Sequence, residues 1–498
     1  MTEKLEQLKE RLGEVADIGR AASVLSWDQQ VNMPPGGNEA RGRQLATLSK
    51  IAQEKFITDE VGRLIDDLKQ EFNGADTDEA ALVRVAARNY DKARRVPPSF
   101  IAEQAIVTSK AFEAWMEARS KSDFSIFQPH LERVVELVHQ YISFFPAGEH
   151  PYDTLLDDYE PGMKTAEVKE IFDGLRPKQV KLIKAIASSK QVKDDFLFKK
   201  FNEKKLNEFG EEVITRFGYD WTRGRQDKAP HPFQTTFSVN DVRITTRFEN
   251  NNPLAMLFST MHEAGHAMYE QGINPSYERT PLAGGTSLAV HESQSRMWEN
   301  LVGRSLPFWE HFYPVLKKMF AAQLDGVSLK SFYKAINKVE PSLIRVNADE
   351  ATYNLHIMLR LELEISMVEG TIAVRDLPEI WNTKMQEYLG ITPPNDARGV
   401  LQDIHWSYGA IGYFSTYALG NLVSAQLWEK IKKDIRNLDD QIRRGDFNEL
   451  LAWLRKNIHQ YGQKHEPQKL VERVTGSKIS PAPYVRYLTK KYSEIYGL

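Results

Sequence analysis

Apolar residues recur at spacings of three and four along most of the 498-residue chain, which is the pattern of amphipathic α-helices. The clearest helical segments are 5–18, 59–72, 127–145 and 165–187. Stretches containing proline or glycine separate the helices, as at 33–37, 96–99, 146–151 and 160–163. We find no repeat of fixed period and no long linker. The pattern therefore predicts a mainly α chain that forms one compact unit with helical lobes.

One region departs from the helical pattern. Residues 232–248, "PFQTTFSVNDVRITTRF", alternate β-branched and aromatic residues with polar ones around "VND". This alternation predicts a β-hairpin. It lies just upstream of the segment that carries the main chemical motif.

That motif is His-Glu-x-x-His within 258–272, "FSTMHEAGHAMYEQG". On a helix, positions four residues apart share a face, so His262 and His266 would point the same way. Two imidazoles with a neighbouring carboxylate, Glu263, are the groups that a zinc hydrolase needs. A five-letter pattern with two wildcards can also match by accident, so the motif alone does not establish a metal site.

The helix that carries the motif has readable ends and much apolar surface. Pro253 follows Asn252 where a helix would begin, and Gly272 stands where it would stop. The apolar side chains predict a buried helix; they are Leu254, Leu257, Phe258, Met261 and Met268. Gly265 costs helix stability, roughly 1 kcal/mol relative to Ala. It either gives room for close packing or substrate, or is merely tolerated.

A zinc hydrolase also needs a third protein ligand. The extended motif with a third histidine does not fit, because Tyr269 and Gly272 occupy its glycine and histidine positions. A glutamate from the next helix is the remaining common choice, and Glu292 is our prediction. Glu299 on the same helix is its rival. We expect Glu270 at the surface or behind the ligands, and His291 to point elsewhere.

Composition limits the remaining possibilities. The chain is 41% hydrophobic and 27% charged, with a formal net charge of −3 and no cysteine. A thiolate nucleophile or ligand is therefore excluded, and nothing favours nucleic-acid or membrane binding. The N-terminal segment is charged and amphipathic, without the apolar core of a signal peptide, and no apolar run approaches the roughly 20 residues of a membrane span. We expect a cytoplasmic protein.

Several longer segments, in consistent order, resemble the Taq carboxypeptidase family of metallocarboxypeptidases. Two of them cover the metal motif, "MHEAGHAMYEQG" (261–272) and "HESQSRMWEN" (291–300). The others are "SWDQQVNMPPGG" (26–37), "HPYDTLLDDYEPGM" (150–163), "HPF" (231–233), "DVRITTRF" (241–248), "IRVNADEATYNLHI" (344–357), "GVLQDIHW" (399–406) and "GYFSTYALG" (412–420). The resemblance covers essentially the whole chain, so we expect residues 1–498 to form a single catalytic domain.

The resemblance implies a large, two-lobed helical fold with a deep central groove, similar to neurolysin and angiotensin-converting enzyme, with the small hairpin or sheet beside the metal site. It implies removal of single residues from peptide C-termini with broad specificity. It further implies one divalent metal ion per chain, zinc or cobalt, and a homodimer.

Each step of amide hydrolysis requires a group. His262, His266 and Glu292 would hold the metal, and Glu263 would take a proton from the attacking water and pass it to the leaving amine. The oxyanion of the tetrahedral intermediate needs a further donor. His405 and Tyr417 are candidates that the resemblance favours, with Tyr413 as the alternative tyrosine.

A carboxypeptidase must also recognise a free carboxylate, which the guanidinium fork of arginine can bind at both oxygens. Arg345 is one candidate, although Asp349 would be its obvious partner in a purely structural ion pair. Arg243 in the hairpin is the other, because an extended peptide could add alongside a strand. His231, before Pro232, is predicted to line the cleft or position the substrate.

Two other functions compete with a carboxypeptidase acting on peptides with a free C-terminus. A metallo-oligopeptidase would share the metal and the base and would lack only the carboxylate clamp. A non-enzymatic helical binding protein would carry the motif by accident. Metal analysis, and cleavage of a free peptide compared with its amide, distinguish the three.

Overall fold

The computed structural model describes residues 3–250 and 252–498, and it divides into two compact units. Unit 1 comprises Met1–Arg94, Asp194–Ile336 and Leu427–Gly476, and unit 2 comprises Arg95–Lys193, Asn337–Gln426 and Ser477–Leu498. Two of the places where the chain changes unit lie within helices, α4 (Asp78–Arg95) and α16 (Ser415–Asp434). Helices dominate both units, which confirms the predicted mainly α class.

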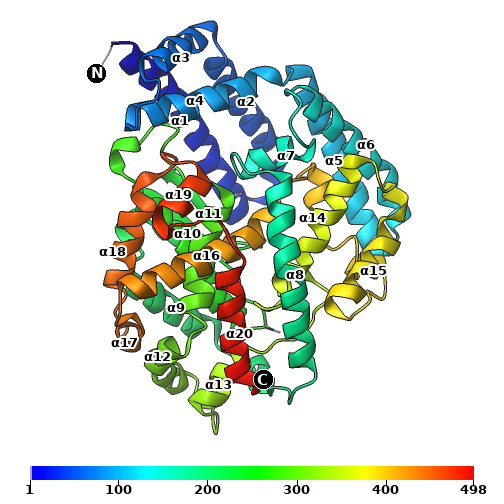
Figure 1. The fold of residues 1–498 in the computed structure, drawn as a ribbon, viewed down its shortest axis with the longest axis vertical. Helices are drawn as coiled ribbons and strands as arrows, with labels where there is room; N and C mark the ends of the chain where they lie inside the picture. Colours follow the sequence, from blue (N-terminus) through cyan, green and yellow to red (C-terminus); the bar gives the residue numbers. More distant parts are fainter. Residues whose placement is uncertain (1–2, 251) are drawn as a thin grey trace. The chain divides into compact units, whose positions relative to one another are not determined.

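Unit 1 holds most of the helices, and α10 and α11 lie side by side within it (Figure 1). Besides α4 and the end of α16, its helices are α1 (Glu3–Val31), α2 (Asn38–Phe56), α3 (Asp59–Glu71), α9 (Glu203–Phe217), α10 (Ala255–Gln271), α11 (Leu288–Arg296), α12 (Leu306–Met319), α13 (Leu329–Ile336), α17 (Leu438–Arg443), α18 (Asn448–Asn457) and α19 (Pro467–Thr475). A π-helical segment, Met297–Val302, continues directly from α11.

The apolar periodicity of the first helices accounts for one hydrophobic core of unit 1. Leu5, Leu8 and Leu12 of α1 meet Leu64 and Leu68 of α3, and the apolar side of α4 joins them. All five leucines are less than a tenth exposed. Burying such a side chain stabilises the fold by about 1.5–3 kcal/mol, so the three- and four-residue spacing determines how these helices pack.

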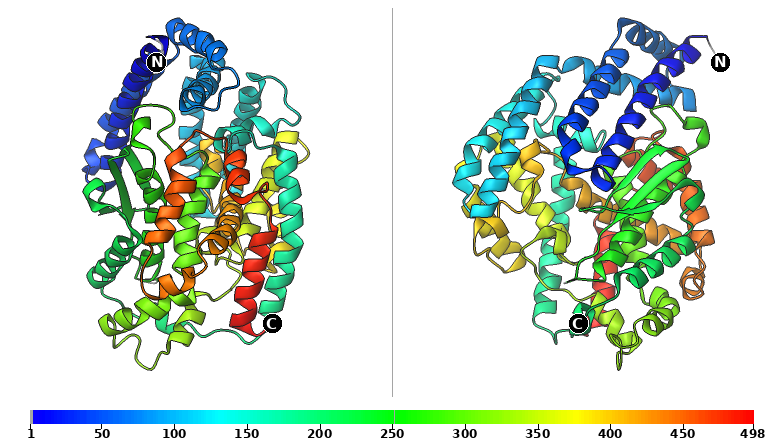
Figure 2. Two further views of the ribbon diagram at one scale, coloured as in Figure 1. Left: turned by 60° about the vertical axis from the view of Figure 1, so that its left-hand side comes forward. Right: turned by 180° about the vertical axis from the view of Figure 1, so that it is seen from behind.

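The predicted hairpin is present, and a third strand joins it within the described residues. β2 (Gln234–Ser238) pairs antiparallel with β3 (Asp241–Thr246), and β1 (Gln226–Lys228) pairs parallel with β3. The order β1-β3-β2 places β3 in the centre. The sheet packs against α10 and α1, and Figure 2 shows the green strands beside the dark blue α1. The sheet therefore adjoins the metal-motif helix, as expected.

Unit 2 is also helical in the part that the structure describes. Besides the start of α16, its helices are α5 (Pro98–Lys121), α6 (Phe124–Ser143), α7 (Tyr152–Tyr159), α8 (Thr165–Ala187), α14 (Tyr353–Glu369), α15 (Leu377–Leu389) and α20 (Ala482–Tyr496). The helix predicted at 165–187 matches α8 in both bounds. None of the described helices combines the length and apolarity that crossing a membrane requires.

A buried carboxylate organises part of unit 2. Glu364 of α14 is fully buried and accepts hydrogen bonds from the Tyr152 hydroxyl (2.6 Å) and the Trp406 indole (2.8 Å). It also accepts one from the backbone N–H of Gly412 (3.0 Å). Buried polar groups need such partners, so Glu364 fixes the segment between His405 and Tyr413, where two of the predicted site residues lie.

Candidate active site

Helix α10 carries both histidines of the motif and is largely buried. The predicted start of the helix is wrong: α10 begins at Ala255 rather than at Pro253. Residues 252–254 first form a turn, in which the Ala255 N–H donates to the Asn252 carbonyl (3.1 Å). The neighbouring Asn251 lies outside the described residues. Burial of the apolar side is confirmed for Leu254, Leu257, Phe258, Met261 and Met268.

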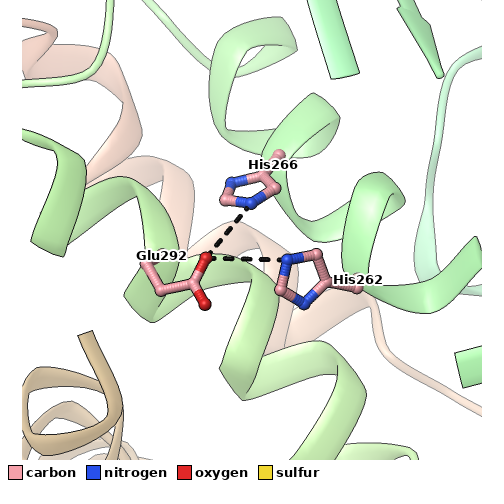
Figure 3. A group of neighbouring side chains, drawn as sticks. All are labelled: His262, His266 and Glu292. Atoms are coloured by element: carbon pink, nitrogen blue, oxygen red, sulfur yellow. Dashed lines mark ion pairs between the residues drawn. The ribbon is translucent and has the colours of Figure 1, made fainter. Parts of the chain in front are cut away.

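Three side chains from α10 and α11 converge (Figure 3). Oε2 of Glu292 lies 3.5 Å from Nε2 of His262 and 3.4 Å from Nε2 of His266. The three possible ligand atoms lie within 4.8 Å of one another. Nitrogen and oxygen ligands at about 2.0–2.1 Å in a tetrahedron lie roughly 3.3 Å apart. The three side chains chosen from the sequence therefore fit a divalent cation.

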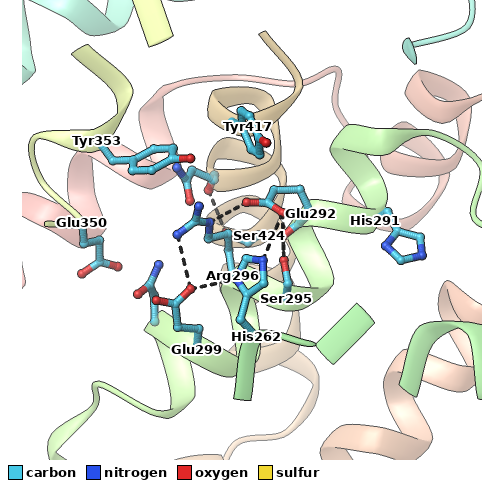
Figure 4. Close-up of polar contacts among 12 residues, drawn as sticks. His262, His291, Glu292, Ser295, Arg296, Glu299, Glu350, Tyr353, Tyr417 and Ser424 are labelled. Carbon is cyan, nitrogen blue, oxygen red and sulfur yellow. Dashed lines mark hydrogen bonds and ion pairs between the residues drawn. The ribbon is translucent and has the colours of Figure 1, made fainter. Parts of the chain in front are cut away.

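The carboxylate of Glu292 is held in place from its own helix (Figure 4). Arg296 Nε donates to Oε1 (2.7 Å), and the Ser295 hydroxyl donates to Oε2 (3.1 Å). Glu292 is 6% exposed, so these contacts also offset the cost of burying its charge. Arg296 engages Oε1 and leaves Oε2 facing the two imidazoles.

Glu299, the rival third ligand, occupies a different place. Its Oε2 lies 2.9 Å from Nδ1 of His262, the ring nitrogen that does not face Glu292. Arg296 Nη1 also reaches Glu299 at 3.3 Å. Metal-binding histidines usually donate their second nitrogen to a carboxylate or carbonyl, which orients the ring. The position of Glu299 matches that supporting role.

Two further residues lie beside the cluster, and one of them, His291, was expected elsewhere. His291 does not point away: its Nδ1 is 2.5 Å from Nδ1 of His266. Its Nε2 is 3.0 Å from Oε1 of Glu270. Glu270 is 5% exposed, so of its two predicted places it occupies the one behind the ligands rather than the surface. The spacing of 21 residues between Glu270 and His291 gave no sign of this contact, because it depends on how α11 packs on α10.

Two glycines of the motif segment are required by close packing. A Cβ on Gly265 would lie 2.7 Å from Cα of Ser295 and 2.8 Å from the carbonyl oxygen of Gln294, both backbone atoms of α11. The close-packing explanation for Gly265 is thus confirmed. Gly272 caps α10 where predicted, and a Cβ there would lie 2.6 Å from the His459 side chain.

Burial and charge shift the titration of the central groups. Burial raises the pKa of Glu263 to about 7, although the charge of His262 opposes the rise. Burial lowers the pKa of His266 to about 3, which leaves its imidazole neutral. Burial alone would raise the pKa of Glu292, but Arg296 and the histidines hold that pKa well below its ordinary range. Glu263 is therefore the carboxylate whose proton affinity suits a base near neutral pH.

The aromatic candidates of unit 2 form one cluster. His405 begins a short 3-10 helix, His405–Tyr408, and its ring stacks on Tyr413 with centroids 5.3 Å apart. The Tyr417 hydroxyl donates to the Tyr413 hydroxyl at 3.2 Å. Burial raises the pKa of Tyr417 well above its ordinary value, so this phenol keeps its proton. The structure thus brings together the three candidate oxyanion donors.

Arg345 joins this cluster, but not with the partner expected from the sequence. Its Nε and Nη2 donate to Oδ1 of Asp403 (3.0 and 2.8 Å), and its Nη1 donates to the Tyr353 hydroxyl (3.0 Å). Asp349 instead accepts from the backbone of 340 and 351–352. Asp403 also pairs with Arg360, so both its oxygens are engaged. Arg345 is 5% exposed, and its role toward substrate stays a prediction.

Arg243 and His231 belong to unit 1. Arg243 points along β3 and pairs with Asp241 through two contacts of 2.8 Å, with its guanidinium over the Trp27 ring (4.5 Å). Arg243 lies on the central strand β3, and the hairpin strand with an open edge, where an extended peptide could add, is β2; peptide addition there stays a prediction. His231 is exposed before the start of β2.

A mainly α-helical chain whose buried helix presents two imidazoles to a glutamate on the next helix defines a helical metallopeptidase. The profile of the Carboxypeptidase Taq (M32) metallopeptidase family matches residues 7–492. The chain therefore belongs to this family and is a metallocarboxypeptidase, an enzyme of a class that works with a divalent metal ion.

Named relatives agree with that assignment. Thermostable carboxypeptidase 1 of Thermus thermophilus is 40% identical over 97% of this chain and 97% of its own length. Carboxypeptidase 1 of Bacillus subtilis is 38% identical over 98% of this chain and 97% of its own length. The crystal structure of the M32 carboxypeptidase from Deinococcus radiodurans R1 superposes with a TM-score of 0.97 at 40% identity and covers both chains completely.

Proposed function

We propose that this enzyme releases single amino acids from peptide C-termini with broad specificity, at a metal centre formed by His262, His266 and Glu292. The main support for the metal centre is that Nε2 of His262 and Nε2 of His266 lie 3.5 and 3.4 Å from the same carboxylate oxygen of Glu292. We assign Zn²⁺ to it, with Co²⁺ as the alternative. A divalent cation there would polarise the scissile carbonyl and acidify the attacking water.

Glu263 is the proposed general base. It lies next to His262 on α10 and is 7% exposed. In its ionised form it accepts a proton from the attacking water, and it then delivers that proton to the leaving amine. The raised pKa supports this exchange, because a group with a pKa of about 7 binds and releases a proton readily near neutral pH.

We assign stabilisation of the oxyanion to His405 and Tyr417, and positioning of Tyr417 to Tyr413. The support is chemical: the Tyr417 phenol stays protonated and can donate, and its hydroxyl is held by Tyr413. Glu364 holds the segment that carries His405 through Trp406. Donors fixed in advance are worth more than donors that must be ordered during the reaction.

We propose an arginine clamp for the substrate carboxylate and rank Arg243 before Arg345. The Arg243 side chain is 20% exposed and has one carboxylate partner, Asp241. The Arg345 side chain is 6% exposed and shares Asp403 with a second buried arginine. A substrate carboxylate could displace Asp241 at lower cost than it could break the buried network. His231 is proposed to position the substrate.

We further propose that both units contribute to one catalytic domain, 1–498, and that the enzyme is a cytoplasmic homodimer. The family profile extends across segments of both units, which supports the single domain. The dimer rests on the resemblance to the family.

The test is a digest of one peptide in two forms, a free acid and a C-terminal amide, followed by mass spectrometry. We expect stepwise loss of single residues from the free acid and at least about a hundredfold lower kcat/KM for the amide, since an arginine facing a neutral amide loses a charge-assisted pair worth several kcal/mol. Glu263→Gln serves as the inactive control. Equal cleavage of both forms, or early cleavage of internal bonds, would replace this proposal with an oligopeptidase.

A further inference from the structure

The two metal-site histidines are supported in different ways. Nδ1 of His262 meets a carboxylate directly, Glu299 at 2.9 Å. Nδ1 of His266 meets another imidazole, that of His291 at 2.5 Å, and His291 in turn meets Glu270 at 3.0 Å. Nδ1 of His266 is thus linked to the supporting carboxylate, that of Glu270, through His291.

The direction of these hydrogen bonds follows from the groups at each end. Nε2 of His266 is the nitrogen that faces Glu292, and a cation can bind there only if that nitrogen carries a lone pair. A neutral imidazole has one N–H, so Nδ1 of His266 must carry the proton and donate to Nδ1 of His291. His291 then donates from Nε2 to Glu270, which as a carboxylate accepts.

We propose that His291 and Glu270 are positioning residues that fix the tautomer and ring orientation of His266 for metal binding. This inference rests on the proposed metal centre. His291 takes the place of the carboxylate that usually accepts a hydrogen bond from a metal-binding histidine. Glu270 is the last acceptor in this series of hydrogen bonds.

Contacts around Glu270 keep the acceptor in place. Its Oε1 also accepts from the backbone N–H of Gly285 (3.1 Å), and the Thr236 hydroxyl of β2 donates to its Oε2 (3.3 Å). A Cβ on Gly285 would lie 2.6 Å from Cδ2 of His291. The loop before α11 therefore closes tightly over the His291 ring, and the sheet anchors the far end of the chain.

A purely space-filling role for His291 is the alternative, and the chain offers a matched control. His459 also packs against Tyr269, with ring centroids 5.1 Å apart, compared with 5.3 Å for His291. His459 is fully buried, and the His291 side chain is 18% exposed. Nε2 of His459 meets Gln294 (2.9 Å), not a metal-site side chain. Replacing either histidine by phenylalanine removes one hydrogen-bonding ring beside Tyr269, but only His291→Phe removes the support of His266.

The experiment measures the dissociation constant for Zn²⁺ by competition with a chromogenic chelator, together with thermal unfolding of the metal-free proteins. We expect His291→Phe to raise the dissociation constant by 10- to 100-fold and His459→Phe to leave it within about twofold of wild type. Glu299→Gln is the positive control, because it replaces the direct carboxylate partner of His262 by an amide, and it should raise the constant by about tenfold. Glu270→Gln should raise the constant by about tenfold, at the low end of the range, because its amide oxygen can still accept.

Wild-type affinity in His291→Phe, or equal losses in His291→Phe and His459→Phe, would overturn the proposal. If His291→Phe does not fold, Glu270→Gln decides: a tenfold weaker affinity supports the positioning chain and unchanged affinity refutes it. A wild-type protein that binds no Zn²⁺ would refute the metal centre and the positioning chain together. A protein that binds Zn²⁺ with the expected variant pattern, but does not release C-terminal residues, would refute only the proposed function.

Discussion

Replacing Gly265 by alanine should reveal how closely the metal centre depends on the contact between α10 and α11. A Cβ there would lie 2.7 Å from Cα of Ser295, whereas ordinary contacts begin at 3.4 Å. The obstacle is helix backbone, so α11 must retreat by about 0.7 Å for the new methyl group to fit, and a core that must absorb an added carbon loses stability. Glu292 lies one turn before Ser295 and would move with the helix.

The expected magnitude is a balance of two opposed effects. Glycine to alanine in an open helix gains about 1 kcal/mol, and overpacking costs about 1–3 kcal/mol. We therefore expect Gly265→Ala to lower the free energy of unfolding by up to about 2 kcal/mol. Gly19→Ala in α1 is the matched control, because a Cβ there meets nothing within 4 Å; it should raise that free energy by about 0.5–1 kcal/mol.

Urea unfolding of both metal-free variants, followed by Zn²⁺ titration, checks the reasoning. A site tolerates displacements of only about 0.5 Å, so Gly265→Ala should also bind Zn²⁺ at least about tenfold more weakly, while Gly19→Ala should bind like wild type. A Gly265→Ala protein that is as stable as Gly19→Ala and binds Zn²⁺ normally would show that the helices can separate freely, and our account of Gly265 would be wrong.

Further substitutions test the proposed base, the third ligand and the buried carboxylate of unit 2. Glu263→Gln should keep the bound metal and the fold but lower kcat by about 10²–10⁴-fold; a variant retaining a tenth of the activity would exclude Glu263 as the base. Glu292→Gln should lose far more Zn²⁺ affinity than Glu299→Gln, as measured by chelator competition, and the reverse order would make Glu299 the ligand. Burial raises the pKa of Glu364 from 4.5 to about 7. The protonated side chain therefore contributes about 3 kcal/mol to the free energy of unfolding below pH 4.5, and this contribution is lost as the pH rises from 4.5 through about 7. Glu364→Gln should flatten the dependence of the free energy of unfolding on pH, as measured by urea unfolding. An unchanged dependence would refute this account of Glu364.

Features determined by neighbouring residues could be predicted from the sequence. The bounds of α8 and the hairpin of β2 and β3 follow from local periodicity and turn residues. His262 and His266 share a helix face because they are four residues apart. Glu292 is an exception, because its approach to the two histidines is a tertiary contact; it was predicted from the need for a third ligand and not from a local pattern.

Features determined by tertiary contacts could not be predicted in this way. The strand β1 is only three residues long, 226–228, and pairs with β3 across an intervening segment. Asp403 is 58 residues from Arg345, whereas Asp349 is near in sequence, and proximity in sequence suggested the wrong ion pair. The contact of His291 with His266 depends on a helix approach that only Gly265 permits, and no local pattern signals it.

The charges around the metal centre link the proposed base, Glu263, to the proposed cation. The described residues there include four carboxylates, Glu263, Glu270, Glu292 and Glu299, faced by the guanidinium groups of Arg296 and Arg304. If both imidazoles are neutral, as metal binding requires, and every carboxylate is ionised, this group has a formal charge of −2, and uncompensated buried charge costs several kcal/mol. A proton on Glu263, whose pKa is raised to about 7, relieves part of that cost but would prevent Glu263 from acting as the proposed base. A divalent cation between His262, His266 and Glu292 would balance the charge and allow Glu263 to stay ionised, which is the state in which it can accept a proton from water.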